Sequence, residues 1–333
     1  MSTTVKEVAT KTRENRLAQA KKLYTSQPHS EQELAEAMGI SLAAAHKLTK
    51  HLHATGANFV QTGDKLLLHD ALEHGGRLVL RPKDRGDGWT VFGFITDKHL
   101  CNKHQRLDVL KAAYKLFAAE GVTDVIDAGN WIDGEARFNK QELLVFGMDD
   151  QLDYLIETHP AEKGITTHYI SGDDHEGWYA QRERVNIGKY LELKARDAGR
   201  ADLHFIGHVE ADIELKARGG SAVMRVMHPG GGSAYAFSYA PQKIVESFQG
   251  GEKPTVLLIG HYHKFEYSYP REVHAVSGGC VVDQTMFMRK NKIAAHVGFT
   301  MIKVKQDQSR GHVIAIEIKW CPFYDRGFYE KKF

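Results

Sequence analysis

The sequence predicts a layered α/β fold preceded by a small, separate helical unit, and two features of the chain indicate this. From about residue 89 onward, short apolar strands alternate with helical stretches. The last part of the chain then returns to alternating strands, in residues 296–304 and 311–320, which suit the second sheet of a layered sandwich. The first 70 residues follow a different, mainly helical pattern.

The N-terminal part begins with a polar helical stretch over residues 1–24. Ser30, followed three residues later by Glu33, gives a capping-box pattern that starts a short helix ending near Met38. The glycine that comes next allows a tight turn, and a second helix is expected over residues 42–53. Two short helices joined by a tight turn are therefore predicted here.

A small hairpin follows in residues 57–69, with Gly63-Asp64 at its tip. Helix, glycine-containing turn, helix and hairpin together resemble a winged helix-turn-helix. Its second helix carries Lys47 and Lys50, which are the candidate DNA contacts of this unit. DNA binding is the leading role, and a protein interaction or simple packing are the alternatives.

Three segments divide the chain. Residues 1–72 form the winged-helix-like unit, residues 73–89 form a linker with little periodicity, and residues 90–333 form the main domain. The five apolar strands of the main domain that end in Gly, Asp or His lie in 91–99, 122–130, 165–175, 221–228 and 255–263. The helices expected between or after them lie near 104–121, 150–158 and 181–198.

Composition narrows the class of protein. The net charge of +2 forces no polyanionic partner, so any DNA-binding surface must be a local patch. The cysteines Cys101, Cys280 and Cys321 lie far apart, which argues for a reducing compartment and against disulfides or a thiolate zinc site. The N-terminal residues show no apolar signal core, and no apolar run is long enough to span a membrane. We expect a cytoplasmic protein without a membrane partner.

Candidate metal ligands stand where the apolar strands end. A strand end holds a side chain rigidly, and the loop after it leaves room for a substrate. Carboxylate, amide and imidazole groups without thiolates suit manganese, iron, zinc or magnesium. The candidate ligands are Asp97, His99, Asn130, Asp174, His228, His261 and His263.

In chain order, these strand ends resemble the motifs of the calcineurin-like metallophosphoesterase superfamily over about residues 90–320. The D-x-H motif appears at residues 97–99, and the G-D-x-x-D-G motif at 129–134 with asparagine in its second position. The G-N-H-D/E motif appears at 172–176, with one additional residue. A lone histidine, His228, and a G-H-x-H motif at 260–263 complete the series. The resemblance implies a four-layer αββα sandwich.

The resemblance also implies a role for each ligand position. The first of two divalent cations would be bound by Asp97, His99 and His263. The second would be bound by Asp174, His228 and His261. Asn130 would bridge the two ions, and His175 would act as a general acid or transition-state stabiliser. Manganese is the expected metal, with iron, zinc and magnesium as alternatives, and Asp133 is expected to support a ligand histidine.

Two positions depart from the family pattern. Asn130 stands where the family has an aspartate, and Asp174 stands where it has an asparagine. This exchange keeps the total charge of the ligands unchanged and would support activity. Alternatively, the loss of the carboxylate at Asn130 is not compensated, and the site has little or no activity. A shift of the alignment by one residue would make Asp173 the ligand in place of Asp174.

The leading function is a metal-dependent DNA phosphodiesterase whose site chemistry resembles that of the Mre11/SbcD nucleases. Arg182 and Arg184, on the expected helix after the His175 motif, are further candidate DNA contacts. One alternative is a nucleotide or small-molecule phosphatase or phosphodiesterase. Another is a DNA-binding or scaffold protein with a degenerate metal site. We expect DNA as the main partner, with a protein partner or a homo-oligomer as further options.

Overall fold

The computed structural model describes residues 15–25, 27–54, 59–62, 64–68, 77–80, 88–232 and 236–323. They belong to two units, Met1–Glu73 and His74–Phe333, which are treated separately below. Among the helices of these residues, none is both long and apolar enough to cross a membrane.

The first unit contains the expected helices and hairpin. Its elements are a helix over residues 15–25, α2 (Glu31–Met38), α3 (Leu42–Ala54), β1 (Phe59–Thr62) and β2 (Lys65–Leu68). The strands pair antiparallel with Thr62 opposite Lys65. Of the predicted turn between them, Asp64 lies in a turn, while Gly63 lies outside the described residues.

Local chemistry explains the start and end of α2. The N–H of Glu33 donates to the Ser30 hydroxyl at 3.1 Å, and the N–H of Ser30 donates to the Glu33 carboxylate at 2.9 Å. This capping box satisfies two backbone donors that the helix itself leaves unpaired. Gly39 ends α2 in the left-handed region, with φ of 62°, and allows the turn into α3.

The main domain contains two six-stranded sheets. In spatial order, the first consists of β14 (Val313–Pro322), β13 (Gly298–Gln306), β4 (Trp89–Ile95), β5 (Asp124–Asp127), β6 (Thr166–Ser171) and β7 (Leu203–His208). The second consists of β11 (Phe265–Ser268), β12 (His274–Gly278), β10 (Val256–Ile259), β9 (Ser221–Met227), β8 (Glu210–Lys216) and β3 (Arg77–Leu80).

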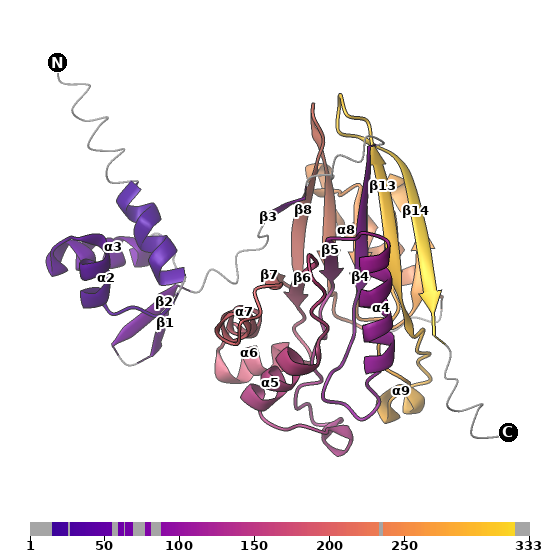
Figure 1. The fold of residues 1–333 in the computed structure, drawn as a ribbon, viewed down its shortest axis with the longest axis horizontal. Helices are drawn as coiled ribbons and strands as arrows, with labels where there is room; N and C mark the ends of the chain where they lie inside the picture. Colours follow the sequence, from indigo (N-terminus) through magenta and orange to yellow (C-terminus); the bar gives the residue numbers. More distant parts are fainter. Residues whose placement is uncertain are drawn as a thin grey trace. The chain divides into compact units, whose positions relative to one another are not determined.

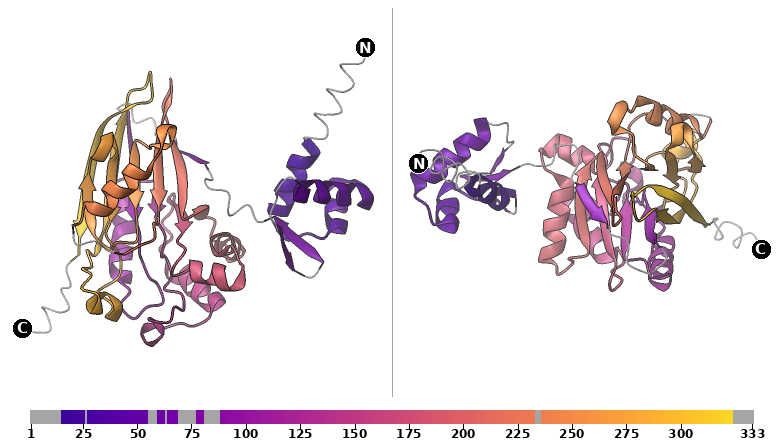
Figure 2. Two further views of the ribbon diagram at one scale, coloured as in Figure 1. Left: turned by 180° about the vertical axis from the view of Figure 1, so that it is seen from behind. Right: turned by 90° about the horizontal axis from the view of Figure 1, so that it is seen from above.

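Helices cover the outer faces of both sheets (Figures 1 and 2). They are α4 (Leu107–Ala119), α5 (Met148–Thr158), α6 (Gly177–Glu183), α7 (Ile187–Asp197) and α8 (Tyr239–Ser247). The short α9 (Met286–Lys290) lies beyond the strand ends (Figure 1). Among the described residues, the 3₁₀ turns η2 (Lys140–Glu142), η3 (Gly250–Glu252) and η4 (Pro270–Glu272) lie in the connections.

Apolar side chains fill each interface between the layers. Phe94 of β4 and Leu258 of β10 belong to the core between the two sheets, and both are fully buried. Phe117 of α4 packs in the core outside the first sheet, and Val245 of α8 packs in the core outside the second. Burying one such side chain contributes about 1.5–3 kcal/mol. The predicted α/β class, with two sheets between outer helices, is confirmed.

The structure corrects three details of the prediction. The C-terminal strands β13 and β14 extend the first sheet beside β4 rather than belonging to the second. Residues 77–80, assigned above to the linker, form β3, which pairs parallel with β8. The expected helix over 181–198 is two helices, because Arg184 adopts a left-handed conformation after α6.

The strand directions bring the motif loops together. In the first sheet β4, β5 and β6 run parallel, and in the second β9 and β10 run parallel. Parallel neighbours end at the same edge of a sheet, which is where ligands bind in α/β folds. The loops that follow these five strands carry all the candidate ligands.

Candidate metal centre

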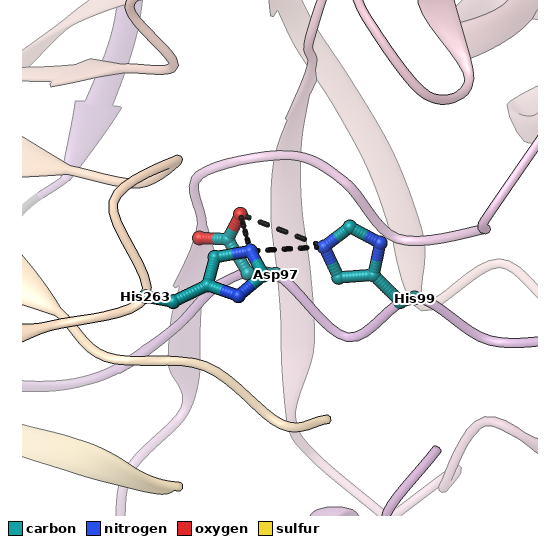
Figure 3. Close-up of side chains that lie close together, drawn as sticks. All are labelled: Asp97, His99 and His263. Atoms are coloured by element: carbon teal, nitrogen blue, oxygen red, sulfur yellow. Dashed lines mark hydrogen bonds and ion pairs between the residues drawn. The ribbon is translucent and has the colours of Figure 1, made fainter. Parts of the chain in front are cut away.

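The first group of ligand-type atoms comes from Asp97, His99 and His263 (Figure 3). His263 Nε2 lies 3.3 Å and His99 Nε2 lies 3.9 Å from the same Asp97 oxygen, Oδ1. The two imidazole Nε2 atoms are 3.1 Å apart. Three donor atoms that converge from loops of both sheets form a site suited to one divalent cation.

Neighbouring groups orient these ligands. The Asp133 carboxylate accepts from Nδ1 of His99 at 3.0 Å, which leaves Nε2 facing the site. The second Asp97 oxygen accepts from the Thr96 hydroxyl at 2.7 Å and from the N–H of His261 at 2.8 Å. Asp97 therefore presents its first oxygen, Oδ1, to the centre.

The second group comes from Asp174, His228 and His261. The Asp174 carboxylate lies 3.5 Å from His228 Nε2 and 3.3 Å from His261 Nδ1. Nδ1 of His228 donates to the Ala128 carbonyl at 2.6 Å, and Nε2 of His261 donates to the Gly231 carbonyl at 2.7 Å. Each backbone bond fixes the ring so that its other nitrogen offers a lone pair to the site.

Asn130 lies between the two groups. Its Nδ2 is 3.5 Å from an oxygen of Asp97 and 3.5 Å from an oxygen of Asp174. Its Oδ1 is buried and has no hydrogen-bond partner among the described residues, and the same holds for His228 Nε2 and for Asp174 Oδ1. Unpaired buried polar atoms are costly, so three of them around one centre indicate a ligand that accepts N and O donors. Divalent cations fit this donor set.

The backbone of the site is strained. Positive φ angles, which side chains rarely adopt, occur at Asp97, His99, Asn130, His261 and His263. Such conformations cost on the order of 1–3 kcal/mol each and are retained where function demands them. The strain turns these ligands away from their strands and toward the common centre.

His175 lies beside the first group without belonging to it. Its Nδ1 donates to the Asp133 carbonyl at 2.8 Å, and its ring centroid is 4.2 Å from that of His99. His175 lines the pocket described below, so its second nitrogen is available for a substrate. Asp173 is exposed and lies outside both groups, and Asp174 is the residue that joins His228 and His261.

Glu176 ties two of the loops together. Its Oε1 accepts the N–H of Asn130 at 2.9 Å and the N–H of Gly172 at 2.8 Å. Burial raises the pKa of Glu176 to about 8. The glutamate thus fixes the loop after β5 relative to the loop after β6, and with it the position of Asn130.

Charges in the centre depend on one another. Although burial favours their neutral forms, the surrounding histidines lower the pKa of Asp97 and of Asp174. Burial and the neighbouring His175 lower the pKa of His99 to about 4. Against the effect of burial, the carboxylates of Asp133 and Asp174 raise the pKa of His175 to about 10. The carboxylates are therefore ionised and ready to bind cations.

A cavity of about 280 Å³ opens over the two groups. Ligand residues, His175 and the backbone of Gly231 and Gly232 form one wall. The remaining lining includes an apolar wall of Phe138, Tyr262, Phe287, Met288 and Ile293. The cavity therefore combines a charged side with a side suited to an apolar or aromatic group.

All seven candidate ligands and His175 meet in this site, whereas the candidate DNA contacts do not line it. Arg182 pairs with Glu183 at 2.5 Å and lies over the Trp178 ring at 4.3 Å. Arg184 is exposed at the end of α6, and Lys47 and Lys50 are exposed on α3 of the other unit. Their part in DNA binding stays a prediction.

Some residues of the site gave no signal in the sequence. Asn102 and Asn139 donate to the same Asp133 oxygen, each at 2.9 Å, and so hold the partner of His99. Phe138 and Phe287 form the apolar wall from segments 149 positions apart (287 minus 138), without any periodic pattern. The only sequence signal near Asn139 is the motif at residues 129–134, which precedes the loop that carries Asn139.

No protein-family model matches the chain, and no curated protein matches it significantly. Among solved structures, it is similar to an archaeal phosphodiesterase at 13% identity, over 70% of this chain and 99% of the other, with a TM-score of 0.37. A zinc complex of Vps29 from Entamoeba histolytica matches at 13% identity over 70% and 99%, with a TM-score of 0.34. GAP50 of Plasmodium matches at 13% identity over 71% and 90%, with a TM-score of 0.40. These sequence identities and TM-scores are too low to indicate a function for this chain.

Proposed function

We propose that this protein is a divalent-metal-dependent phosphodiesterase that acts on DNA. The observation that carries the hydrolytic part is the arrangement of two aspartate–histidine groups on either side of Asn130, with His175 beside them. Two adjoining cation sites of N and O donors are suited to in-line attack on a phosphate ester.

Each part of the centre has a separate task. One cation would be held by Asp97, His99 and His263, and the other by Asp174, His228 and His261. Bound cations supply charge neutralisation at the phosphoryl oxygens and activate a water molecule. With cations bound, the Asn130 amide would turn its unpartnered Oδ1 toward them and supply a neutral oxygen donor, so the negative charge of the centre would come from Asp97 and Asp174. We propose manganese as the metal; oxygen and imidazole nitrogen donors suit it as they also suit iron and zinc, and elemental analysis distinguishes the three.

His175 is suited to the leaving group. Its side chain is 15% exposed and faces the cavity, and its Nδ1 is anchored by the Asp133 carbonyl. The Asp133 carboxylate, which belongs to neither proposed ligand group, lies 3.4 Å from His175 Nδ1 and raises the pKa of His175, so it favours the protonated ring. A protonated imidazole at this position can donate its Nε2 proton to a departing alkoxide.

The choice of DNA rests on the N-terminal unit. α3 follows a tight turn after α2, and its exposed residues include Lys47 and Lys50. In the part of the chain that the structure describes, neither lysine forms an ion pair, whereas His46 pairs with Glu31 at 3.0 Å. Two free ammonium groups on one exposed helix are suited to phosphate contacts.

A second candidate is a nucleotide or small-molecule phosphatase or phosphodiesterase. The cavity of about 280 Å³ favours it, because that volume holds one small group and no duplex. In this case the N-terminal unit would serve assembly with a protein partner or a second copy.

One panel of substrates separates these functions. With manganese present, hydrolysis is measured on linear and nicked duplex DNA, single-stranded DNA, bis-p-nitrophenyl phosphate and p-nitrophenyl phosphate. The proposal expects cleavage of DNA and of the diester. Turnover of the monoester or of bis-p-nitrophenyl phosphate without DNA cleavage would favour the second candidate. Absence of turnover with any metal would favour a binding protein with a degenerate site.

A further inference from the structure

Two aromatic rings stand exposed at the mouth of the cavity. Phe138 lies in the turn before η2 and is 52% exposed, and Phe287 lies in α9 and is 41% exposed. Their ring centroids are 4.6 Å apart, with an angle of 32° between the planes. Adjacent exposed phenylalanines bury less apolar surface than they could, which is typical of a surface that receives a ligand.

These rings lie next to the catalytic side of the cavity. The Phe138 ring centroid is 6.0 Å from that of His175, which in turn is 4.2 Å from that of His99. Met288 and Ile293 also line the cavity and belong to its apolar wall. A group joined to the phosphate by a few bonds would therefore reach the phenylalanine pair while the phosphate lies at the metal ligands.

Hydrogen bonds hold both segments that carry the pair. The Asn139 amide donates to the Asp133 carbonyl at 2.8 Å, which fixes the turn at Phe138 to the support of His99. The N–H of Met286 donates to the Glu142 carboxylate at 3.1 Å and joins the start of α9 to η2. The aromatic surface is therefore tied to the metal centre.

We propose that Phe138 and Phe287 form a stacking platform for an unpaired nucleobase of the nucleotide whose phosphate is hydrolysed. This inference rests on the proposed function and names the form of DNA that the site accepts. In a duplex, both faces of an interior base are covered by its neighbours, so only an unpaired or terminal base can offer a face to the platform. A single-stranded segment or a frayed end is the substrate.

The lysines of α3 favour a nucleobase over another aromatic group, such as a phosphotyrosine side chain. Lys47 and Lys50 give the chain a second surface suited to a phosphate backbone. A phosphotyrosine peptide would use the cavity but would gain nothing from that surface, and it enters the test as a competing substrate.

The test compares two single-stranded oligonucleotides, one intact and one with a tetrahydrofuran abasic residue at the cleaved position. We expect wild-type protein with manganese to cleave the intact strand about ten-fold faster in kcat/KM, because base–aromatic stacking is sequence-tolerant and strong. The double variant Phe138→Ala/Phe287→Ala should lose this preference, and Phe138→Tyr/Phe287→Tyr should keep it. The matched control is Phe146→Ala, which removes a 56% exposed phenylalanine that does not line the cavity.

Binding gives a second readout that does not depend on turnover. With calcium in place of manganese, a 2-aminopurine in the oligonucleotide should lose fluorescence on binding wild-type protein and lose less on binding the double alanine variant. Elemental analysis should give the same manganese content for both proteins.

The proposal is overturned if wild-type protein cleaves intact and abasic strands equally, if the double alanine variant keeps the preference and the quenching, or if a phosphotyrosine peptide is hydrolysed faster than either strand. Failure of wild-type protein to hydrolyse bis-p-nitrophenyl phosphate would instead overturn the proposed function.

Discussion

Asn130 decides how charge is distributed in the centre. It is the neutral residue between two carboxylates, with its amide 3.5 Å from an oxygen of Asp97 and 3.5 Å from an oxygen of Asp174. A carboxylate there would place three negative groups around two cations, whereas an amide leaves two. The presence of Asp174 in the second group supplies the charge that Asn130 does not.

This compensation leads to a prediction at Asp174. Asp174→Asn should weaken manganese binding by at least about 10- to 100-fold. Mutating a residue that only supports a metal ligand already causes a loss of this size. Adding Asn130→Asp should restore much of the binding, because the pair then carries the same total charge in the opposite order. Equilibrium dialysis with elemental analysis measures both variants.

The control for this pair is Asp173→Asn, which removes a carboxylate from the exposed neighbour of Asp174. It should bind manganese as wild-type protein does. Equal metal loss in the Asp173 and Asp174 variants would contradict the assignment, and so would a double variant that binds no better than Asp174→Asn.

His175 gives a prediction that depends on the leaving group. His175→Ala should slow cleavage of DNA by about 100- to 10,000-fold, because an alkoxide needs a proton as it departs. Hydrolysis of bis-p-nitrophenyl phosphate should fall much less, since p-nitrophenolate leaves without protonation. Initial rates on both substrates, at equal manganese content, measure the difference. An equal loss on the two substrates would rule out the general-acid role.

At this scale the sequence predicted which of the candidate ligands lie close together, and for a physical reason. Each ligand follows an apolar strand, so Asp97, Asn130 and His228 could be placed at a sheet edge before any contact was known. Phe138 and Phe287 could not be found, because a turn and a helix of five residues have no periodicity that marks a shared surface.

Among the elements, the loops between strands and helices position the catalytic groups. Gly134 shows this most clearly: its φ is +62°, and a Cβ added there would come within 2.2 Å of the His175 carbonyl oxygen. The loop after β5 and the loop after β6 can approach this closely only because residue 134 has no side chain.

Gly134→Ala should therefore displace His175 and lower DNA cleavage nearly as far as His175→Ala does. Gly164→Ala is the matched control, because Gly164 also has a positive φ, +85°, but a Cβ there would meet no described atom within 4 Å. Both variants should lose about 1 kcal/mol of stability from the left-handed backbone. Gly134→Ala should lose further stability from the clash with the His175 carbonyl, and only Gly134→Ala should lose activity. Thermal unfolding measures the stability of both variants, and initial rates of DNA cleavage measure their activity. Equal activity in the two variants would show that the close approach of residue 134 to the His175 carbonyl does not matter for catalysis.

Element boundaries were harder to predict than element types. The alternating pattern of β13 and β14 indicates strands with one covered face, yet it cannot tell which sheet they join. β3 has only four residues, too few for a pattern to distinguish a strand from a linker. The break between α6 and α7 depends on the left-handed backbone of Arg184, which is uncommon for arginine and therefore unexpected.

At the scale of the whole molecule, we propose that one unit hydrolyses the phosphate ester and the other contacts DNA. The basic surface of the first unit is small, since a groove between α2 and α3 also carries the acidic residues Glu31, Glu33 and Glu36. A small number of phosphate contacts is therefore expected, with affinity that falls moderately with salt.

Lys47→Ala/Lys50→Ala in the full chain should weaken DNA binding and reduce the slope of log affinity against log salt by about 2, since each lysine would neutralise one phosphate. Hydrolysis of bis-p-nitrophenyl phosphate should not change. Lys21→Ala/Lys22→Ala, which removes two exposed lysines from the preceding helix, is the matched control and should keep the wild-type slope. Fluorescence anisotropy of labelled DNA at several salt concentrations measures the slope for each protein. An unchanged slope in the Lys47/Lys50 variant would assign the N-terminal unit to another role.

The domain boundaries also matter for any truncation. Removing residues 1–85 would delete β3, the edge strand that pairs with β8 in the second sheet. A truncation that keeps residues 77–80 preserves this sheet, so loss of DNA binding in it can be attributed to the N-terminal unit.

The most direct test of the whole account is a crystal of the full chain grown with manganese and measured at a wavelength where manganese scatters anomalously. We predict two anomalous peaks per chain, one contacted by Asp97, His99 and His263 and the other by Asp174, His228 and His261, with Asn130 touching both. A map without peaks among these side chains, or with manganese bound elsewhere, would contradict the account.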